Sequence, residues 1–128
     1  MTDTLTIAAP PGEFIESLAA PLGELFLLTK TEFGGITIAA SGERWIVLNP
    51  NPYAEIEDPD TVPMIAGLIG AAPSYFTLTT SNLPLTRRVV QKLAERRDLV
   101  VDTQHGIILP LHEFAELIRA RPMWDWRR

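Results

Sequence analysis

The chain of 128 residues contains no cysteine. Disulfide bonds and thiolate metal sites are therefore excluded, and the composition fits a reducing compartment, so we expect a cytoplasmic protein. The first fourteen residues also lack the positive charge and the long apolar run of a secretory signal, so we expect none. The length predicts one domain, and the 46% of hydrophobic residues suits a packed core rather than a disordered chain.

A long apolar run is missing as well. Residues 61–86 carry no charge, but their most apolar part, residues 62–76, is short and interrupted by Pro63 and Pro73. A helix that spans a membrane needs about 20 apolar residues. We therefore predict a buried helix over residues 62–72, followed by a buried strand over residues 74–81, and no membrane partner.

Familiar catalytic motifs are also absent. No serine lies in a Gly-x-Ser-x-Gly elbow, and the sequence has no phosphate-binding loop or dinucleotide fingerprint. The only cluster that contains histidine comprises Asp102, His105, His112, Glu113 and Glu116, which are residue types suited to a metal ligand or a general base. Only His112 and Glu116 have the i, i+4 spacing of a helical ligand pair. We predict no catalytic residue, metal or cofactor, and keep a small enzyme that uses Asp102, His105 and His112 as an alternative.

The spacing of apolar residues predicts ten elements of secondary structure. We expect helices over residues 11–21, 62–72, 85–98 and 111–120, and strands over residues 23–31, 34–41, 43–49, 74–81, 99–103 and 107–110. Glycine-containing turns at residues 31–35, 41–42 and 104–106 favour hairpins. The expected fold is α+β: a single domain over residues 1–128, with a mostly antiparallel sheet of about six strands and helices packed on a face. Its order is α-β-β-β-α-β-α-β-β-α.

The same patterns indicate which side chains form the core. The helix over residues 62–72 is apolar nearly all round, so it should be well buried. The side chains expected to stabilise the fold most are Phe26, Leu28, Trp45, Val47, Ile65, Leu68, Ile69, Phe76, Leu78, Val89, Leu93, Val100, Ile108, Phe114 and Ile118.

Charge is distributed unevenly over a chain whose formal net charge is −5. Residues 1–64 carry ten acidic and two basic side chains, whereas residues 65–128 carry six acidic and nine basic ones. Much of the positive charge lies on one predicted helix, at Arg87, Arg88, Lys92, Arg96 and Arg97. This helix either faces solvent, contacts phosphates, or is neutralised by the acidic half of the chain. Because the chain is acidic overall, we predict no nucleic-acid partner.

An acidic, proline-rich loop is predicted over residues 49–60. Its three prolines keep it stiff, and it carries Glu55, Glu57, Asp58 and Asp60 beside Tyr53 without a single basic residue. A stiff loop loses little entropy on binding, so this one suits a basic protein partner. The alternative is a solvated linker that keeps the domain soluble.

The C-terminal tail places Trp124 and Trp126 on either side of Asp125. Tryptophan side chains contribute large apolar areas to cores and to interfaces. We therefore keep two interpretations: the tail folds back on the core, or the two tryptophans bind a partner.

Together these observations favour a non-enzymatic protein-binding module. The most specific hypothesis is a small acidic cytoplasmic inhibitor, such as a toxin-immunity protein, that neutralises a basic partner such as a toxin domain. Its expected partner-binding residues are Tyr53, Glu55, Glu57, Asp58, Asp60, Trp124 and Trp126. The alternatives are the small enzyme described above and a regulatory subunit of an oligomer. The sequence does not predict an oligomeric state.

Overall fold

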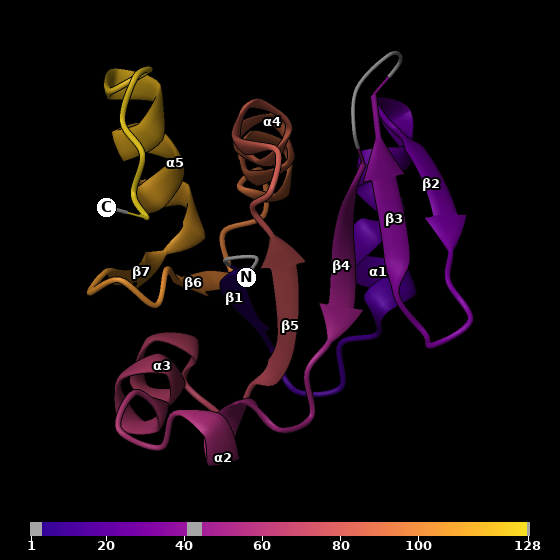
Figure 1. Cartoon of the computed structure of the whole chain (residues 1–128). Helices are drawn as coiled ribbons and strands as arrows, with labels where there is room; N and C mark the ends of the chain where they lie inside the picture. Colours follow the sequence, from indigo (N-terminus) through magenta and orange to yellow (C-terminus); the bar gives the residue numbers. More distant parts are fainter. Residues whose placement is uncertain (1–3, 41–44, 128) are drawn as a thin grey trace.

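The computed structural model describes residues 4–40 and 45–127 (Figure 1). The elements in chain order are β1 (Thr4–Ala9), α1 (Ile15–Ala19), the 3₁₀ helix η1 (Ala20–Glu24), β2 (Leu27–Lys30), β3 (Ile36–Ala39), β4 (Ile46–Pro50), α2 (Ala54–Glu57), α3 (Val62–Ile69), β5 (Ser74–Thr79), α4 (Leu83–Leu93), β6 (Val100–Asp102), β7 (Ile108–Pro110) and α5 (Leu111–Ala120). Seven strands form one antiparallel sheet in the order β2-β3-β4-β5-β1-β6-β7. The predicted α+β fold is confirmed, and each of the ten expected elements is present.

The hairpin turns follow the glycine pattern where the structure describes them. Between β2 and β3, the amides of Thr31 and Gly35 donate to the Gly35 carbonyl and the Thr31 hydroxyl, each at 2.9 Å. Gly34 supplies the positive φ of this turn, at 82°. The predicted turn at residues 41–42 lies outside the described residues, although the strands on either side of it pair as expected.

Strand β1 was missed by the sequence analysis, and it lies near the middle of the sheet. It pairs with β5 on one side and with β6 on the other, and thereby joins the two halves of the chain. Its sequence, TLTIAA, alternates polar and apolar residues as a half-buried strand does. Leu5 and Ile7 are completely buried. The order of elements therefore begins with a strand rather than with a helix.

Alternation along the strands gives the sheet two unlike faces. One face carries aliphatic side chains such as Leu5, Ile7 and Leu78, and α1, η1, α4 and α5 cover it. The other face carries Thr6, Thr77 and Asp102 across neighbouring strands, and α3 packs there over β1, β6 and β7 (Figure 1). Helices therefore cover both faces of the sheet, not one face as predicted.

Most of the expected core is confirmed, with two exceptions. The buried members are Phe26, Ile65, Phe76, Leu78, Val89, Leu93, Val100, Phe114 and Ile118, and the partly buried ones are Leu28, Val47, Ile69 and Ile108. The prediction is wrong for Trp45 and Leu68, whose side chains are exposed. Trp45 lies two residues before Val47, so it projects on the side of the sheet away from the main core. On that side, none of the described helices lies over β3 and β4 (Figure 1).

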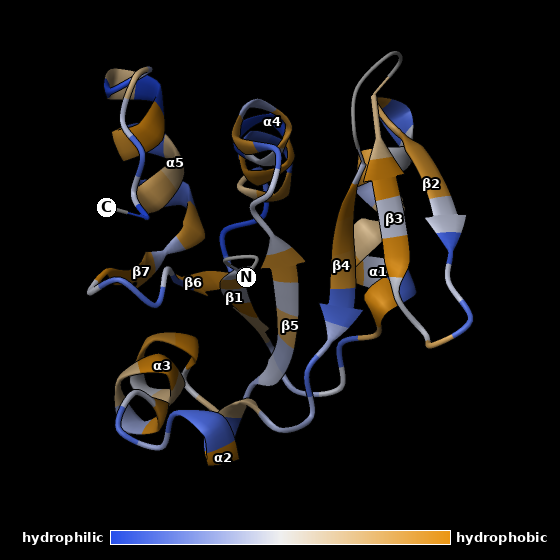
Figure 2. Cartoon of the chain, in the orientation of Figure 1, coloured by the Kyte–Doolittle hydropathy of each residue, from blue (hydrophilic) through white to orange (hydrophobic). Residues whose placement is uncertain are grey.

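Helix α3 is far more exposed than expected. It buries only Ile65, against Ala8 and Val100 of the sheet. One eight-residue helix on an open sheet face covers its partner with a single stripe, so the rest of its apolar surface meets solvent. Figure 2 shows hydrophobic residues over much of α3. The well-buried helix predicted from composition is thus a partly exposed one.

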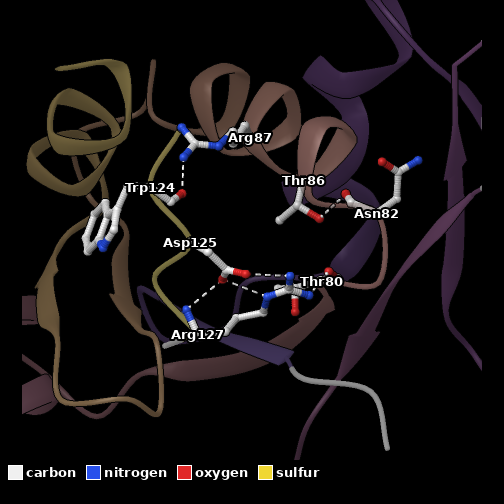
Figure 3. A network of polar contacts seen from close by, with 7 residues as sticks. All are labelled: Thr80, Asn82, Thr86, Arg87, Trp124, Asp125 and Arg127. Carbon is white, nitrogen blue, oxygen red and sulfur yellow. Dashed lines mark hydrogen bonds and ion pairs between the residues drawn. The ribbon is translucent and has the colours of Figure 1, made fainter. Parts of the chain in front are cut away.

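The C-terminal tail folds back on the core. Trp126 is only 2% exposed and meets Phe114 edge to face at 5.3 Å between ring centroids, and Trp124 meets the same ring at 6.2 Å. The Arg127 guanidinium donates to the Asp125 carboxylate at 2.7 and 2.8 Å and to the Thr80 carbonyl at 3.0 Å, and the Arg127 amide donates to the same carboxylate at 2.9 Å (Figure 3). This packing supports the core interpretation of the two tryptophans.

The positive charge of the basic helix α4 is neutralised in part within the molecule. Lys92 pairs with Glu24 at 2.9 Å, and Arg96, just after the helix, pairs with Glu13 at 2.9 Å and with Asp98 at 2.8 Å. The hydrogen bonds that Arg96 donates to Asp98 and Glu13 raise the pKa of Arg96, and the bonds to Asp98 lower the pKa of that carboxyl group. Glu13 and Glu24 come from the acidic half of the chain. Of the three interpretations of this helix, the intramolecular one has direct support.

Candidate functional site

The sequence predicts a loop without secondary structure over residues 49–60, but the structure shows a helix within it. This helix is α2, whose first turn closes when the amide of Glu57 donates to the Tyr53 carbonyl at 2.9 Å. The loop is tied to the sheet because the Asn51 amide donates to the Tyr75 carbonyl at 2.8 Å. The Asn51 side chain then accepts the amide of Tyr53 at 3.1 Å. The loop is therefore held in one shape on the open face of the sheet.

The outer surface of α2 and α3 combines apolar and acidic side chains. Ile56 is 77% exposed, Tyr53 64%, Met64 58% and Leu68 46%. The carboxylates of Glu55, Glu57 and Asp60 are exposed beside them, and no basic residue occurs between residues 45 and 86. We call this surface the α2–α3 ridge, and it consists of Tyr53, Glu55, Ile56, Glu57, Asp60, Met64 and Leu68.

Sequence reasoning found the acidic part of the ridge but missed its apolar part. Ile56 was treated as one residue of a polar loop, and Met64 and Leu68 were assigned to a buried helix. The available signal was the composition of α3, which is apolar nearly all round over only two turns. A helix that short presents one side to a sheet, so a fully apolar one leaves large side chains in solvent.

Behind the ridge lies a polar cavity of about 450 Å³ between α2, α3 and the sheet. We call it the acidic pocket. The described residues that line it are Thr4, Thr6, Asn51, Ala54, Glu57, Asp58, Thr61, Val62, Ile65, Tyr75, Thr77, Asp102 and Gln104. Two of the predicted partner-binding residues, Glu57 and Asp58, therefore line the same pocket as Asp102. The sequence analysis placed Asp102 in the cluster that contains the histidines. The three carboxylates come from two segments of the chain, the acidic loop and the end of β6.

Asp102 is the most buried carboxylate of the pocket, at 6% exposure. Its Oδ1 atom accepts the amide of Gln104 at 2.7 Å, and the Gln104 side chain donates to the Thr6 hydroxyl at 2.8 Å. Burial raises the pKa of Asp102 above the ordinary value of 3.8; the Gln104 amide opposes this shift, and the charge of Asp58 adds to it. The carboxylate is thus held in place by a backbone amide, and no basic residue among those described pairs with it.

Tyr75 is another residue of the pocket wall. Its hydroxyl is buried and makes no hydrogen bond with any described residue. Burial, and to a smaller extent the charge of Glu55, raises the pKa of this phenol. Tyr75 and the threonines of the pocket could not be singled out from the sequence, because their neighbours depend on how the strands pair.

The histidines do not join Asp102 in this pocket. His105 is exposed in the turn after β6, and His112, in the first turn of α5, lines no part of the pocket. Within the described ranges, no group of three or more His, Asp or Glu side chains is arranged to hold a metal ion. The absence of a metal and of catalysis stays a prediction.

Over residues 4–40 and 45–127, no helix has the length and apolarity to cross a membrane.

Replacement of Asp102 by asparagine is expected to stabilise the fold at neutral pH. Asparagine keeps the oxygen that accepts the Gln104 amide and removes the buried charge near Asp58 and Glu57. Because the pKa of Asp102 is raised in the folded state, the wild type loses stability relative to the variant as the pH rises from 3.8 through the folded-state pKa. Urea unfolding of both proteins at pH 4 and pH 7 checks this. A variant that is less stable than wild type at pH 7 would contradict it.

The predicted partner-binding residues thus divide into two groups. The acidic residues and Tyr53 gather on the ridge and the pocket, whereas Trp124 and Trp126 pack around α5, against the other face of the sheet (Figure 1). The tail therefore does not extend the ridge. Comparisons with protein-family models, with curated proteins and with solved structures gave no match to this chain.

Proposed function

We propose that this chain is a non-enzymatic protein-binding module whose α2–α3 ridge docks a basic protein. The observation that carries the proposal is the exposure of four large apolar side chains on α2 and α3, together with exposed carboxylates that form no ion pair with a described residue. Contiguous exposed apolar surface with a polar rim is typical of interaction sites. A partner with an apolar contact area and a rim of lysine and arginine fits this surface in both respects.

The ridge contributes to the rate of association with the basic partner as well as to the affinity of the complex. Exposed carboxylates cost little in water, where a pair at 4 Å interacts by about 1 kcal/mol. They attract a basic partner over longer distances and raise its association rate. Ile56 and Met64 then supply apolar area that is removed from water on contact.

The shape of the loop reduces the cost of docking. Pro50 and Pro52 restrict the backbone before α2, and the hydrogen bonds of Asn51 fix the loop to β5. A segment that is ordered before binding loses less entropy on binding. We therefore propose an inhibitor that covers its target by steric occlusion and acts in the cytoplasm, such as an immunity protein that neutralises a basic toxin domain.

The test is a pair of apolar-to-charged substitutions on the ridge, Ile56→Asp and Met64→Asp. Both side chains are exposed, so the free energy of unfolding should change by no more than about 0.5 kcal/mol. Loss of a central apolar contact should weaken the complex by about 2 kcal/mol or more, roughly thirtyfold in Kd. Candidate targets are basic proteins encoded next to this chain, and calorimetry measures their affinity.

The matched control is Met123→Asp. Met123 is an exposed apolar residue of the C-terminal tail and is not part of the α2–α3 ridge. Met123→Asp should leave affinity within about twofold of wild type. If the ridge variants bind the target as tightly as wild type, the proposed docking surface is wrong.

A further inference from the structure

The two edges of the sheet are protected to different degrees. Strand β7 forms one edge; it ends at Pro110, which has no amide hydrogen, and it contacts α3 and α5. Strand β2 forms the other edge, at the right of Figure 1, and among the described strands it pairs only with β3. A free edge strand offers unpaired backbone groups to a further strand. The edge at β2 is therefore the place where this sheet can be extended.

The backbone groups that point outward from this edge belong to Leu28 and Lys30. The Thr31 amide donates to the Gly35 carbonyl at 2.9 Å, so these two opposed residues are a hydrogen-bonded pair. Hydrogen-bonded and non-hydrogen-bonded pairs alternate along antiparallel strands. Thr29 therefore directs its backbone groups toward β3, whereas Leu28 and Lys30 direct theirs away from the sheet. Each of these two residues offers one amide hydrogen and one carbonyl oxygen to another strand.

Large apolar side chains are exposed along the same edge. Leu25 is 56% exposed, Leu27 72% and Phe33 91%. Leu25 precedes β2 and Phe33 lies in the turn after it, so the two residues flank the strand at opposite ends. When two copies of such a strand pair in antiparallel orientation, the first end of one lies beside the second end of the other. The edge is thus self-complementary, because Leu25 of each copy then meets Phe33 of the other.

A hollow of about 220 Å³ lies beside this edge, on the side of the sheet that α1 and η1 cover. Its wall is mainly apolar and carries one side chain of each charge; it consists of Glu16, Ala19, Ala20, Leu28, Lys30 and Ile36. The Lys30 ammonium lies 3.8 Å from the Glu16 carboxylate, and both side chains are exposed. An edge strand with an adjacent hollow binds a further strand through backbone hydrogen bonds and one inserted side chain.

We propose that two copies of this chain associate through antiparallel pairing of their β2 strands. The two-fold axis passes beside Thr29, so that Thr29 lies opposite Thr29 of the second copy and Leu28 lies opposite Lys30. Each of the two Leu28–Lys30 pairs forms two backbone hydrogen bonds, since the outward groups of these residues face each other. The methylene stem of each Lys30 covers the hollow of the other copy, and Glu16 there accepts its charge. The two sheets become continuous.

Charge favours a second copy at this edge over the basic partner proposed for the ridge. The chain has a formal net charge of −5, so two copies repel each other at acidic surfaces. The hollow beside β2 carries one acidic and one basic side chain, and two copies meet there without net repulsion. The ridge remains accessible in this dimer, because α2 and α3 lie away from β2 (Figure 1). The inference therefore does not depend on the proposed function.

Sedimentation equilibrium of the whole chain, at about 5 to 500 µM, is the first test. We expect a reversible dimer with a dissociation constant on the order of 10–100 µM, because one edge strand buries less area than a standard interface. Lys30→Ala removes the side chain and should weaken the dimer a few fold. Lys30→Pro also removes the outward amide hydrogen and should weaken it at least about tenfold more. That amide does not bond to β3, so both variants should melt within a few degrees of each other.

A single introduced cysteine reports the register, because the chain has no cysteine of its own. Thr29→Cys places two cysteines opposite each other as a non-hydrogen-bonded pair, about 4.5 Å apart between Cα atoms, which a disulfide can bridge. Leu27→Cys is exposed as well, but its two copies lie more than about 13 Å apart in this register. Under mild oxidation, Thr29→Cys should form the covalent dimer at least about tenfold faster than Leu27→Cys.

Three results would overturn the proposal: the chain stays monomeric up to about 500 µM, Lys30→Pro and Lys30→Ala weaken the dimer equally, or the two cysteine variants cross-link at the same rate. Trp45→Lys changes an exposed residue on the open face of the sheet and should alter the dissociation constant by less than about threefold. A dimer that Trp45→Lys abolishes and Lys30→Pro preserves would mean that the sheets pack face to face instead. Ile56→Asp should leave the dimer intact, so the edge and the ridge are tested separately.

Discussion

Replacement of Phe114 by alanine is expected to lower the free energy of unfolding by about 4 kcal/mol. Phe114 is completely buried on α5 and contacts both Trp124 and Trp126 edge to face. Removal of its ring leaves a cavity that the two indoles cannot fill without moving the tail. Urea unfolding followed by circular dichroism gives the difference between the two proteins.

Phe33→Ala is the matched control for this experiment. Phe33 is exposed in the turn between β2 and β3, so its loss should change the free energy of unfolding by less than about 0.5 kcal/mol. Phe76→Ala, at a buried position of β5, should cost about as much as Phe114→Ala. A loss below about 1 kcal/mol for both buried phenylalanines would mean that the core is assigned wrongly.

Removal of residues 123–128 is the second change with a large expected effect. It takes away Trp126, whose loss alone should cost about 3–5 kcal/mol, together with the partly buried Trp124. It also removes the bond from Arg127 to the Thr80 carbonyl, and Arg87 loses its contact with the Trp124 carbonyl (Figure 3). The melting temperature should therefore fall by more than about 10 °C.

Met123→Ala is the control that changes an exposed side chain of the same tail. Met123 belongs to the same tail but is exposed, so its replacement should leave the melting temperature nearly unchanged. If the truncated chain melts like wild type and no longer binds its partner, the tryptophans belong to an interface instead of the core.

The sequence predicts most of the fold because the strand and helix periods are strong in it. The stripe of Leu85, Val89 and Leu93 on α4 is buried as its spacing indicates. Strand β1 was not predicted, because the N-terminal segment was considered only as a possible targeting signal. Its place in the middle of the sheet depends on pairing with β5 and β6, about 70 and 95 residues away, which no local pattern reveals.

The candidate site is less predictable than the fold. The acidic residues of the loop are visible in the sequence, but their arrangement is not. Asp58 and Asp102 line the same pocket only because α3, which follows the acidic loop, packs on the sheet face beside β6. The exposure of Met64 and Leu68 depends equally on tertiary structure, since it follows from how little of the sheet α3 covers.

The association rate of the chain with a purified basic partner tests the central claim, that the ridge docks such a protein. We compare wild type with Glu55→Lys/Asp60→Lys, since these two exposed ridge residues do not line the acidic pocket. The matched control is Glu113→Lys/Glu116→Lys, which makes the same change in net charge on exposed positions of α5. Stopped-flow measurements are made at ionic strengths of about 0.1 M and 1 M, where the Debye length is about 10 Å and 3 Å.

At the lower ionic strength, the ridge variant should associate at least about tenfold more slowly than wild type, and the control variant should stay much closer to wild type. At the higher ionic strength the three rates should converge, because screening removes the long-range attraction. A ridge variant that associates as fast as wild type at low salt, or a control variant that slows to the same extent, would contradict the account.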